Sequence, residues 1–482
     1  MSFKGRTVAL LVGAAMLASS VVTLAAVDLP SLASLASGGQ AAATGKGLSP
    51  QETQKINSVL GIIENKYVTP VEREKIVNGA VHGMISALED PYSSYMEAEE
   101  AQQFNNSVEG AFTGIGAVLA MKNGEITVIS PIKGSPAEKA GVKPKDVFLS
   151  VNGESLSGKT LNEAVEKIRG AKGTKAKIEI KRAGQSEPIE LTVIRDEVDL
   201  ETVYPKMLDD KIGYIEVRQF SMNTLERFKE ALQNLEKQDM KGLIIDVRNN
   251  PGGVLDIVQK MMEQFVPKGK TIVQVENRNK ERDKYNSQGT STTVKPYPIA
   301  VLTNKGSASA SEIMASALKE SAGAKLVGEQ TFGKGTVQMG YDSGDGGMIK
   351  ITIAKWLTPD GHWIHQKGIE PDIVVHQPEY YSVAPLPRDK TLKFAMNDAD
   401  VKNMQLMLDG LGYKPGGTNG YFSKETEAAL KSFQRAVGLS ATGQVDAKTA
   451  KKLEADILQA MRDPKNDAQL NKAVETVKQE IH

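Results

Sequence analysis

The strongest constraint on the fold is a pattern that occurs twice: a short apolar run, a turn of small residues, and then a helix. Residues 242–247 read Gly-Leu-Ile-Ile-Asp-Val, and residues 298–303 read Pro-Ile-Ala-Val-Leu-Thr. Helical periodicity follows at 255–265 and again at 312–320. A continuous apolar run is typical of a parallel strand that is covered on both faces. The repeated pattern therefore predicts a domain of the α/β class.

The turns that follow the two apolar runs are where a site is expected, because α/β folds bind ligands at the carboxyl ends of their strands. The first turn, 248–253, ends in Gly252 and Gly253, whose N–H groups are suited to bind an oxyanion. A Gly-Gly pair is equally typical of an ordinary left-handed turn between a strand and a helix. This turn alone leaves both interpretations open.

The second turn contains three serines that alternate with alanines, Ser307, Ser309 and Ser311. A serine on a strand-to-helix turn lies beside helix N–H groups, which is the geometry of an acyl-transfer nucleophile. The spacing leaves all three serines as candidates. Ser309 and Glu312 also form the pattern of a capping box, in which the serine caps the helix and the glutamate bonds back to it.

Lys334 is the best candidate for the base that a serine nucleophile requires. It lies between Gly333 and Gly335 rather than on a charged surface. If residues 334–339 form a strand, Lys334 and Gln338 share one face, so a neutral amide can hold the lysine without adding a charge. Burial beside apolar groups would lower the pKa of the ammonium and supply a neutral amine.

Histidine is the usual alternative base, and the chain has five. His362 and His365 lie at a turn, where Asp360 or Asp372 could complete a Ser-His-Asp triad. A histidine near a turn is more often a surface or packing residue, so we favour Lys334. The histidines lack HExxH spacing and the chain lacks cysteine, so we expect no metal and no other cofactor.

Composition and the N-terminus indicate the surroundings of the protein. A chain of 482 residues is too long for one hydrophobic core and predicts three or four domains. The 59 basic and 59 acidic side chains balance, which gives no reason to expect a nucleic-acid partner. Lys4, Arg6 and an apolar run at 8–27 predict a signal peptide or membrane anchor within residues 1–36. We therefore expect export to the extracytoplasmic side of the membrane, the intermembrane space or the cell wall.

Changes in pattern divide the rest of the chain into blocks. Helical periodicity near the N-terminus gives apolar stripes without a core of their own, and the chain ends in an amphipathic helix. We expect both regions to pair subunits in a homodimer. The predicted blocks are a linker and helical dimerisation region at 37–110, a β-rich domain at 111–197, the α/β domain at 198–380, a three-helix domain at 395–456 and the final helix at 457–482.

The β-rich block resembles a PDZ domain. The motifs are Gly-Ile-Gly-Ala-Val at 114–118, Ser-Pro-Ala-Glu-Lys-Ala-Gly at 135–141 and a helix at 161–168. The resemblance implies that N–H groups of a Gly-x-Gly loop bind a peptide's terminal carboxylate while the peptide adds as a strand. Arginine at the end of the helix is a further candidate contact, although a solvated arginine is more typical there. The residues implicated are Gly114, Ile115, Gly116, Ala117 and Arg169.

The α/β block resembles the carboxyl-terminal processing proteases, also called tail-specific proteases. The motifs are Leu-Ile-Ile-Asp-Val-Arg-Asn-Asn-Pro-Gly-Gly at 243–253, Gly-Ser-Ala-Ser-Ala-Ser-Glu at 306–312 and Gly-Lys-Gly-Thr-Val-Gln at 333–338. With the PDZ-like block, the resemblance covers roughly residues 50–380. It implies a serine-type endopeptidase with an α+β core of the ClpP/crotonase type and an inserted PDZ domain.

This resemblance implies roles for individual residues. The middle serine, Ser309, is the nucleophile, Lys334 is its base, and Gln338 orients the lysine. The PDZ domain binds the C-termini of protein substrates and controls access to the site. The N–H groups of the oxyanion hole are those of Ala310 and of Gly252 or Gly253.

The three-helix block resembles a peptidoglycan-binding-like domain, through Gly-Tyr-Phe at 420–422, Phe-Gln at 433–434 and Gly-Gln-Val-Asp at 443–446. A domain of this kind is also reused for oligomerisation or packing. The expected partners are protein substrates with accessible C-termini, membrane-anchored regulators among them, and peptidoglycan. Relatives in spore-forming bacteria point to sporulation-related signalling proteolysis. The alternative is a non-catalytic scaffold that binds PDZ ligands and the cell wall.

Overall fold

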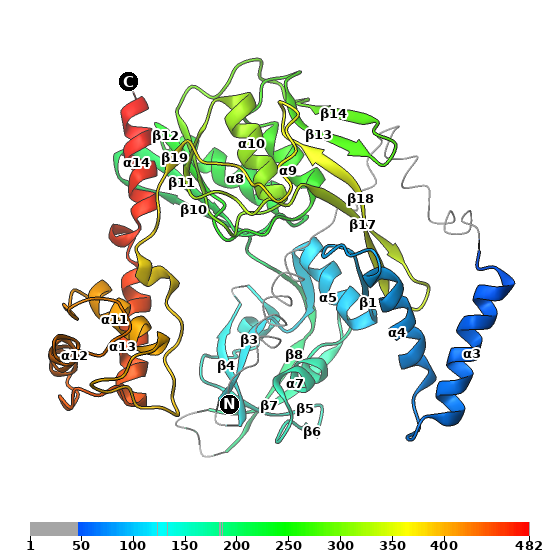
Figure 1. Cartoon of the computed structure of the whole chain (residues 1–482), viewed down its shortest axis with the longest axis horizontal. Helices are drawn as coiled ribbons and strands as arrows, with labels where there is room; N and C mark the ends of the chain where they lie inside the picture. The colour runs from blue at the N-terminus through cyan, green and yellow to red at the C-terminus, as the bar shows by residue number, and fades with distance from the viewer. Residues whose placement is uncertain (1–46, 123, 133, 183–184, 186, 482) are drawn as a thin grey trace.

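The computed structural model describes residues 47–122, 124–132, 134–182, 185 and 187–481. The predicted export segment and most of the predicted linker lie outside the described residues. Figure 1 shows the α/β domain with the PDZ-like domain below it, the three-helix domain to one side, and helix α3 (Pro50–Lys66) projecting on the other side.

The α/β domain contains a six-stranded sheet in the order β10-β11-β12-β15-β16-β19. The edge strand β10 is antiparallel to β11, and the other neighbours are parallel. The two predicted apolar strands, β12 and β15, lie side by side with every residue buried, so the predicted α/β class is confirmed. The strands are β10 (Val203–Met207), β11 (Ile212–Val217), β12 (Gly242–Asp246), β15 (Ile299–Thr303), β16 (Lys325–Gly328) and β19 (Ile373–Val374).

Helices cover both faces of this sheet, because alternate residues of a strand point to opposite sides. Leu243 and Ile245 of β12 belong to the cluster formed with α8 (Thr224–Lys237), α9 (Leu255–Met262) and α10 (Ala310–Ala322). Ile244, between them, belongs to a second cluster on the opposite face.

The opposite face is covered by α14 (Ala468–Glu480), which packs on β12, β15 and β16. Its Leu470, Ala473 and Val477 are buried against this sheet. Figure 1 shows α14, in red, running along that side of the domain. The prediction that the final helix contacts another subunit is therefore wrong for this apolar face, because the chain's own sheet already buries it.

A second sheet continues the domain and has the strand order β1-β18-β13-β14, with β17 also paired to β18. Strand β1 comes from the N-terminal region, where Ser94 pairs with Lys350 of β18. The turn just before β1 therefore lies against the α/β domain. The strands are β1 (Ser94–Met96), β13 (Thr271–Asn277), β14 (Arg282–Asn286), β17 (Thr336–Asp342) and β18 (Met348–Leu357).

The PDZ-like domain has its own core and the sheet order β3-β4-β5-β7-β8, with β6 (Glu154–Ser155) paired to β5. Helix α7 (Leu161–Ile168) spans the predicted residues, and a short helix α6 (Pro136–Lys139) precedes it. In the sequence, β2 (Ala111–Gly114) precedes this domain and β9 (Asp196–Asp199) follows it. The two strands pair as a separate antiparallel ribbon. The sheet strands are β3 (Ala117–Lys122), β4 (Glu125–Pro131), β5 (Val147–Val151), β7 (Lys175–Lys181) and β8 (Ile189–Ile194).

The N-terminal helices contribute little to any core. Neither α3 nor α4 (Arg73–Ser86) contains a buried residue, whereas α5 (Ala98–Glu109) buries Ala101. Of the helices that the structure describes, none has the length and apolar character needed to cross a bilayer. The apolar side chains exposed on and around α3 and α4 include Ile56, Val59, Ile62, Val77 and Met84.

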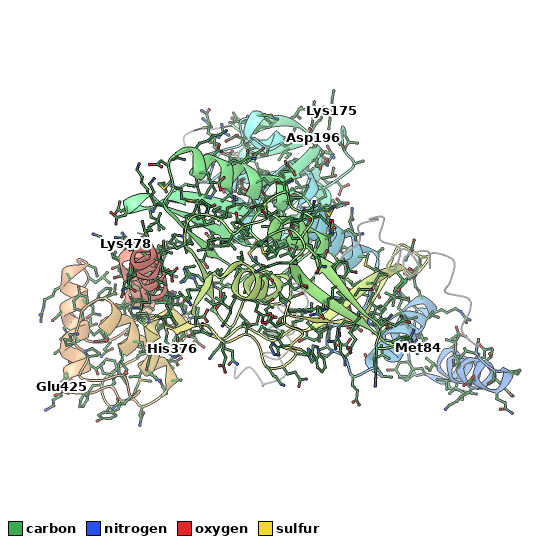
Figure 2. All side chains as sticks on the ribbon, turned by 90° about the horizontal axis from the view of Figure 1, so that it is seen from above. Met84, Lys175, Asp196, His376, Glu425 and Lys478 are labelled. Carbon is green, nitrogen blue, oxygen red and sulfur yellow. The ribbon has the colours of Figure 1, made fainter. Side chains whose placement is uncertain are left out.

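The three-helix domain consists of α11 (Ala399–Gly410), α12 (Lys424–Ala436) and α13 (Ala447–Arg462) around its own apolar cluster. A short helix, η4 (Glu379–Ser382), precedes it, and η5 (Pro464–Asn466) joins α13 directly to α14. Figure 2 shows α14, marked by Lys478, between the orange helices that carry Glu425 and the α/β domain.

Candidate active site

Ser309 lies on the turn between β15 and α10 in a strained backbone conformation. Its φ is 54° and its ψ is −114°, a region that non-glycine residues rarely adopt. Strain of this kind persists only where the surroundings enforce it, and it is common at reactive serines on strand-to-helix turns. The Ser309 side chain is half-buried rather than enclosed.

The two neighbouring serines are fully buried and their hydroxyls are engaged. Ser307 Oγ donates to the carbonyl of Val247 at 2.8 Å, and Ser311 Oγ donates to the carbonyl of Asn250 at 2.8 Å. Both bonds tie the serine turn to the turn after β12. Ser309 therefore differs from Ser307 and Ser311 in exposure and in conformation.

The glycine turn approaches Ser309 so closely that only glycine fits. A Cβ at Gly252 would lie 2.9 Å from Ser309 Cβ and 3.0 Å from the nitrogen of Ala310. The Gly252 N–H is occupied, because it donates to Asn250 Oδ1 at 2.8 Å. In the described part of the chain, the N–H groups of Gly253 and Ala310 have no hydrogen-bond acceptor. Of the two predicted glycines, Gly253 is thus the one with an available donor.

Lys334 is buried, with 2% of its surface exposed, and lies just before β17. Its Nζ has no hydrogen-bond partner among the described residues and lies 5.0 Å from the centre of the Tyr92 ring. Burial, followed by the nearby charge of Lys350, lowers the Lys334 pKa to about 7, although Glu312 and Asp90 oppose the shift. A neutral amine is therefore available near neutral pH.

Glu312 connects the serine turn to the lysine segment. Its Oε2 accepts the N–H of Ser309 at 2.8 Å and the N–H of Lys334 at 2.9 Å. Its Oε1 accepts the N–H of Gly333 at 2.7 Å and the hydroxyl of Thr331 at 2.5 Å. Burial raises the Glu312 pKa, while these four donors favour the ionised carboxylate. The sequence indicated Glu312 only as a capping-box residue, and nothing in its local pattern predicted the contacts with 331–334.

Gln338 lies on β17 but is not bonded to Lys334 in this structure. The strand begins at Thr336 rather than at Lys334, and a register shift between Val337 and Gln338 breaks the simple alternation of faces. Gln338 Nε2 donates to Thr336 Oγ1 at 2.9 Å and to Thr352 Oγ1 at 3.1 Å. The expected arrangement of one strand face carrying lysine and amide is therefore not the one observed.

Asp90 extends this polar network from the turn before β1. Its Oδ2 accepts the hydroxyls of Thr352 and Ser93, both at 2.6 Å. Hydrogen bonds from these hydroxyls lower the Asp90 pKa against the opposing effect of burial. The local sequence around Asp90 and Tyr92 does not predict this site, because their approach to Lys334 depends on long-range pairing of β1 with β18.

The alternative histidine triad is not assembled. His365 lies near the lysine, but its Nδ1 accepts the N–H of Gly335 at 3.4 Å and its ring stacks on Trp363. Asp372 instead pairs with Lys319, and no bond joins either histidine to Asp360 or Asp372 within the described residues. Likewise, no group of three or more histidine, aspartate or glutamate side chains in the described part of the chain could hold a metal ion.

The predicted carboxylate-binding loop connects β2 to β3. Gly114 ends β2, Ala117 begins β3, and Gly116 between them has a φ of 75°. The carbonyls of Ile115 and Gly116 accept the N–H groups of Ala137 and Ile132, at 2.7 and 2.9 Å. The N–H groups of Ile115 and Gly116 have no acceptor in the part that the structure describes. Arg169 follows α7 as its C-cap and is half-buried.

Comparisons with known proteins identify the families that the domains of this chain match. Family models match for peptidase family S41 at residues 211–375, a PDZ domain at 127–182, the N-terminal domain of the activating protease CtpB at 10–100 and a peptidoglycan binding domain at 397–453. The carboxy-terminal processing proteases CtpB and CtpA of Bacillus subtilis are 47% and 44% identical over 426 and 427 residues. The aligned parts cover 88% and 89% of this chain, and 88% and 90% of those proteins.

Among solved structures, the photosystem II D1 C-terminal processing protease is 26% identical, with a TM-score of 0.41, over 72% of this chain and 94% of that one. The matches to the peptidase and PDZ family models define a serine-type peptidase with a PDZ domain for substrate recognition. The chain belongs to the carboxy-terminal processing proteases of peptidase family S41. Its peptidoglycan-binding domain indicates an extracytoplasmic location.

The Glu312→Gln variant tests the importance of the buried carboxylate. Glutamine cannot accept all four hydrogen bonds, because its amide nitrogen would face two donors. We expect the free energy of unfolding of the α/β domain to fall by about 2–4 kcal/mol. The only tryptophans, Trp356 and Trp363, both lie near the site, so urea unfolding followed by tryptophan fluorescence reports this domain.

Glu320→Gln is the matched control, since Glu320 lies on the same helix and its carboxylate accepts the N–H of Asp360 at an exposed position. We expect this control to change the free energy of unfolding by less than about 0.5 kcal/mol. Equal destabilisation by the two variants would show that Glu312 has no special part in holding the site together.

Proposed function

We propose that this protein is an exported endopeptidase that uses Ser309 as nucleophile and Lys334 as base. The observation that carries the proposal is the buried amine of Lys334, which has no hydrogen-bond partner among the described residues. Its burial lowers the Lys334 pKa to about 7. Ser309 supports it as the one serine of its turn that is neither buried nor bound to a carbonyl of the preceding loop. Glu312 binds the main-chain N–H groups of both residues, so their backbones lie together.

In this mechanism, the neutral amine of Lys334 takes the proton from the Ser309 hydroxyl as the oxygen attacks the substrate carbonyl. Negative charge then develops on the carbonyl oxygen, and the free N–H groups of Gly253 and Ala310 are the donors that would stabilise it. The lysine ammonium returns its proton to the departing amine, which leaves an acyl-enzyme. Water, activated by the same amine, then hydrolyses this ester and restores the serine.

Gln338 is proposed to orient Lys334 during proton transfer. Its Nε2 is engaged by the hydroxyls of Thr336 and Thr352, which leaves its Oε1 as the atom able to accept a bond from the lysine. A neutral amide suits this role, because a carboxylate in the same place would raise the lysine pKa and stabilise the inactive ammonium.

We expect Ser309→Ala and Lys334→Ala to lose essentially all casein-cleaving activity, because each removes a group that forms or breaks a bond. Gln338→Ala should lower kcat by about 10- to 100-fold, since it removes orientation only. Lys367→Met is the control, because Lys367 is an exposed lysine whose removal leaves the buried groups unchanged. Proteolysis by the Ser309 and Lys334 variants at the rate of the unaltered chain would rule out the Ser-Lys mechanism.

The pH dependence of kcat/KM tests the base independently. Below a pH of about 7 Lys334 is protonated, so kcat/KM should fall about tenfold for each further pH unit and level off above it. The measurement uses a peptide without titrating groups between about pH 5 and pH 9. His365 lies near Lys334, so His365→Gln is the control, and the fall of kcat/KM below a pH of about 7 should persist in it. Loss of this pH dependence in His365→Gln would assign the base to His365.

We also propose that the PDZ domain binds the C-terminus of the substrate along β3. This strand is an edge of its sheet, and its Val118 and Met121 are exposed. A peptide that adds to such an edge places its terminal carboxylate at the Ile115–Gly116 loop, whose N–H groups are free in the described structure. Arg169 is proposed as a further contact for an acidic terminus.

Amidation of the peptide terminus tests this recognition. A peptide with a free, apolar C-terminus should bind the uncleaving Ser309→Ala chain at least about tenfold more tightly than its amidated form, because amidation removes the charge that the loop N–H groups bind. Isothermal titration with the two peptides measures the difference. Equal affinities would show that the domain does not read the terminal carboxylate.

The proposed setting is signalling proteolysis, sporulation-related in spore-forming bacteria, of membrane-anchored regulators near the peptidoglycan layer. The exposed apolar side chains of α3 and α4 support a homodimer formed through the N-terminal helices. Capture of substrates by the Ser309→Ala chain would identify the regulators, and recovery of no membrane-anchored protein would argue against this setting. Sedimentation equilibrium tests the dimer, which a monomer at micromolar concentration would contradict.

A further inference from the structure

A buried ion cluster joins the start of the glycine turn to the C-terminal helix. Arg248 donates to both oxygens of Asp467, from Nη1 at 2.9 Å and from Nη2 at 2.8 Å. It also bonds Asp246 through Nε at 3.0 Å and Nη2 at 2.6 Å. The three side chains are only 5–15% exposed. A bidentate arginine–carboxylate pair fixes the orientation of the guanidinium as well as its position.

Arg248 is the residue from which the turn to Gly252 and Gly253 departs. The next residue, Asn249, has a φ of 55° and is bonded to Asn304 in both directions, N to Oδ1 and Nδ2 to Oδ1, each at 2.9 Å. Asn304 Oδ1 also accepts the N–H of Gly306 on the serine turn. A shift of Arg248 would therefore be transmitted to both turns of the active site.

Asp467 comes from a distant part of the chain. It lies 219 residues after Arg248 and outside residues 211–375, which the peptidase family model matches. Its carboxylate also caps α14, by accepting the N–H of Leu470 at 2.9 Å, and accepts the amide of Gln377 at 2.7 Å. Because η5 joins α13 to α14, Asp467 stands directly between the peptidoglycan-binding domain and the sheet.

We propose that Asp467 is a positioning residue for the active site: it holds Arg248, and through Arg248 the turn that carries the Gly253 donor. Helix α14 is thereby part of the working peptidase, and the C-terminal domain is connected to the catalytic turn through one carboxylate. This inference rests on the proposed function, because it assigns an effect on catalysis to a residue that does not touch the substrate.

The charge balance of the cluster allows Asp467 to be neutralised without leaving an unpaired buried charge. One arginine faces two aspartates, so neutralising Asp467 leaves a balanced Arg248–Asp246 pair instead of an isolated buried charge. Tyr214, Gln377 and Gln469 make further hydrogen bonds to the cluster. Asparagine is also a good helix cap, so Asp467→Asn retains the start of α14.

We expect Asp467→Asn to lower kcat for a short peptide about tenfold, while KM changes by less than about twofold. A purely structural role would lower the urea midpoint but leave kcat of the folded enzyme unchanged. Asp463→Asn is the matched control, because Asp463 caps η5 on the same connection and does not contact Arg248. The control should retain the kcat of the unaltered chain, and an equal loss in both variants would overturn the inference.

A double-mutant cycle tests whether the effect passes through Arg248. Arg248→Gln should lower kcat at least as much as Asp467→Asn, and the double variant should be no slower than Arg248→Gln alone. If kcat of the double variant instead fell by the product of the two single fold-losses, the proposed connection would be overturned. Ser309→Ala, assayed in parallel, separates the inference from the function: a fully active Asp467→Asn with an inactive Ser309→Ala refutes only the inference, whereas an active Ser309→Ala refutes the Ser-Lys mechanism.

Discussion

The candidate active site depends on one buried carboxylate at the beginning of α10. Glu312 accepts four hydrogen bonds, and the donors come from the serine turn and from residues 331–334. An ionised carboxylate in a dry interior is costly unless every lone pair is used, so this arrangement is stable only when both segments are in place. The serine turn and the lysine segment are thereby held together through their backbones, and the side chains of Ser309 and Lys334 are left available for chemistry.

Short polar side chains hold the serine turn against the turn after β12. Ser307 and Ser311 are too short to reach far, but their buried hydroxyls donate to carbonyls of the turn after β12. Asn250 accepts the N–H of Gly252, which orders the glycine turn from within. Small polar side chains therefore act as fixed spacers between adjacent turns, and glycine is required at 252 because a Cβ would meet Ala308, Ser309 and Ala310. Alternation of serine with alanine serves this packing as well as the candidate nucleophile.

The sequence predicted those parts that depend on local pattern. The buried strands β12 and β15 were evident from continuous apolar runs, and α7 lies at the helix expected at 161–168 in the PDZ-like block. The contacts of Asp90 and Tyr92 were missed, because they depend on pairing between β1 and β18, which are about 250 residues apart. The strand at Lys334 was predicted two residues too early, since a glycine-flanked segment gives no alternation from which to read its start. The apolar face of α14 was assigned to another subunit, whereas it packs on the chain's own sheet. An amphipathic helix shows that it needs a partner without showing which surface provides it.

The main chain and the side chain of Lys334 lie in different electrostatic surroundings, and this difference determines the pKa of the amine. Its backbone N–H donates to the Glu312 carboxylate, whereas its Nζ lies over the Tyr92 ring and has no acceptor in the described structure. An ammonium in direct contact with that carboxylate would be stabilised, which would oppose the proposed role of Lys334 as a base. The nearby Lys350, itself buried with a pKa lowered to about 8, adds a further cost to protonation. A carboxylate can therefore organise the proposed Ser-Lys site and still leave the lysine amine neutral, provided that it binds the backbone and not the amine.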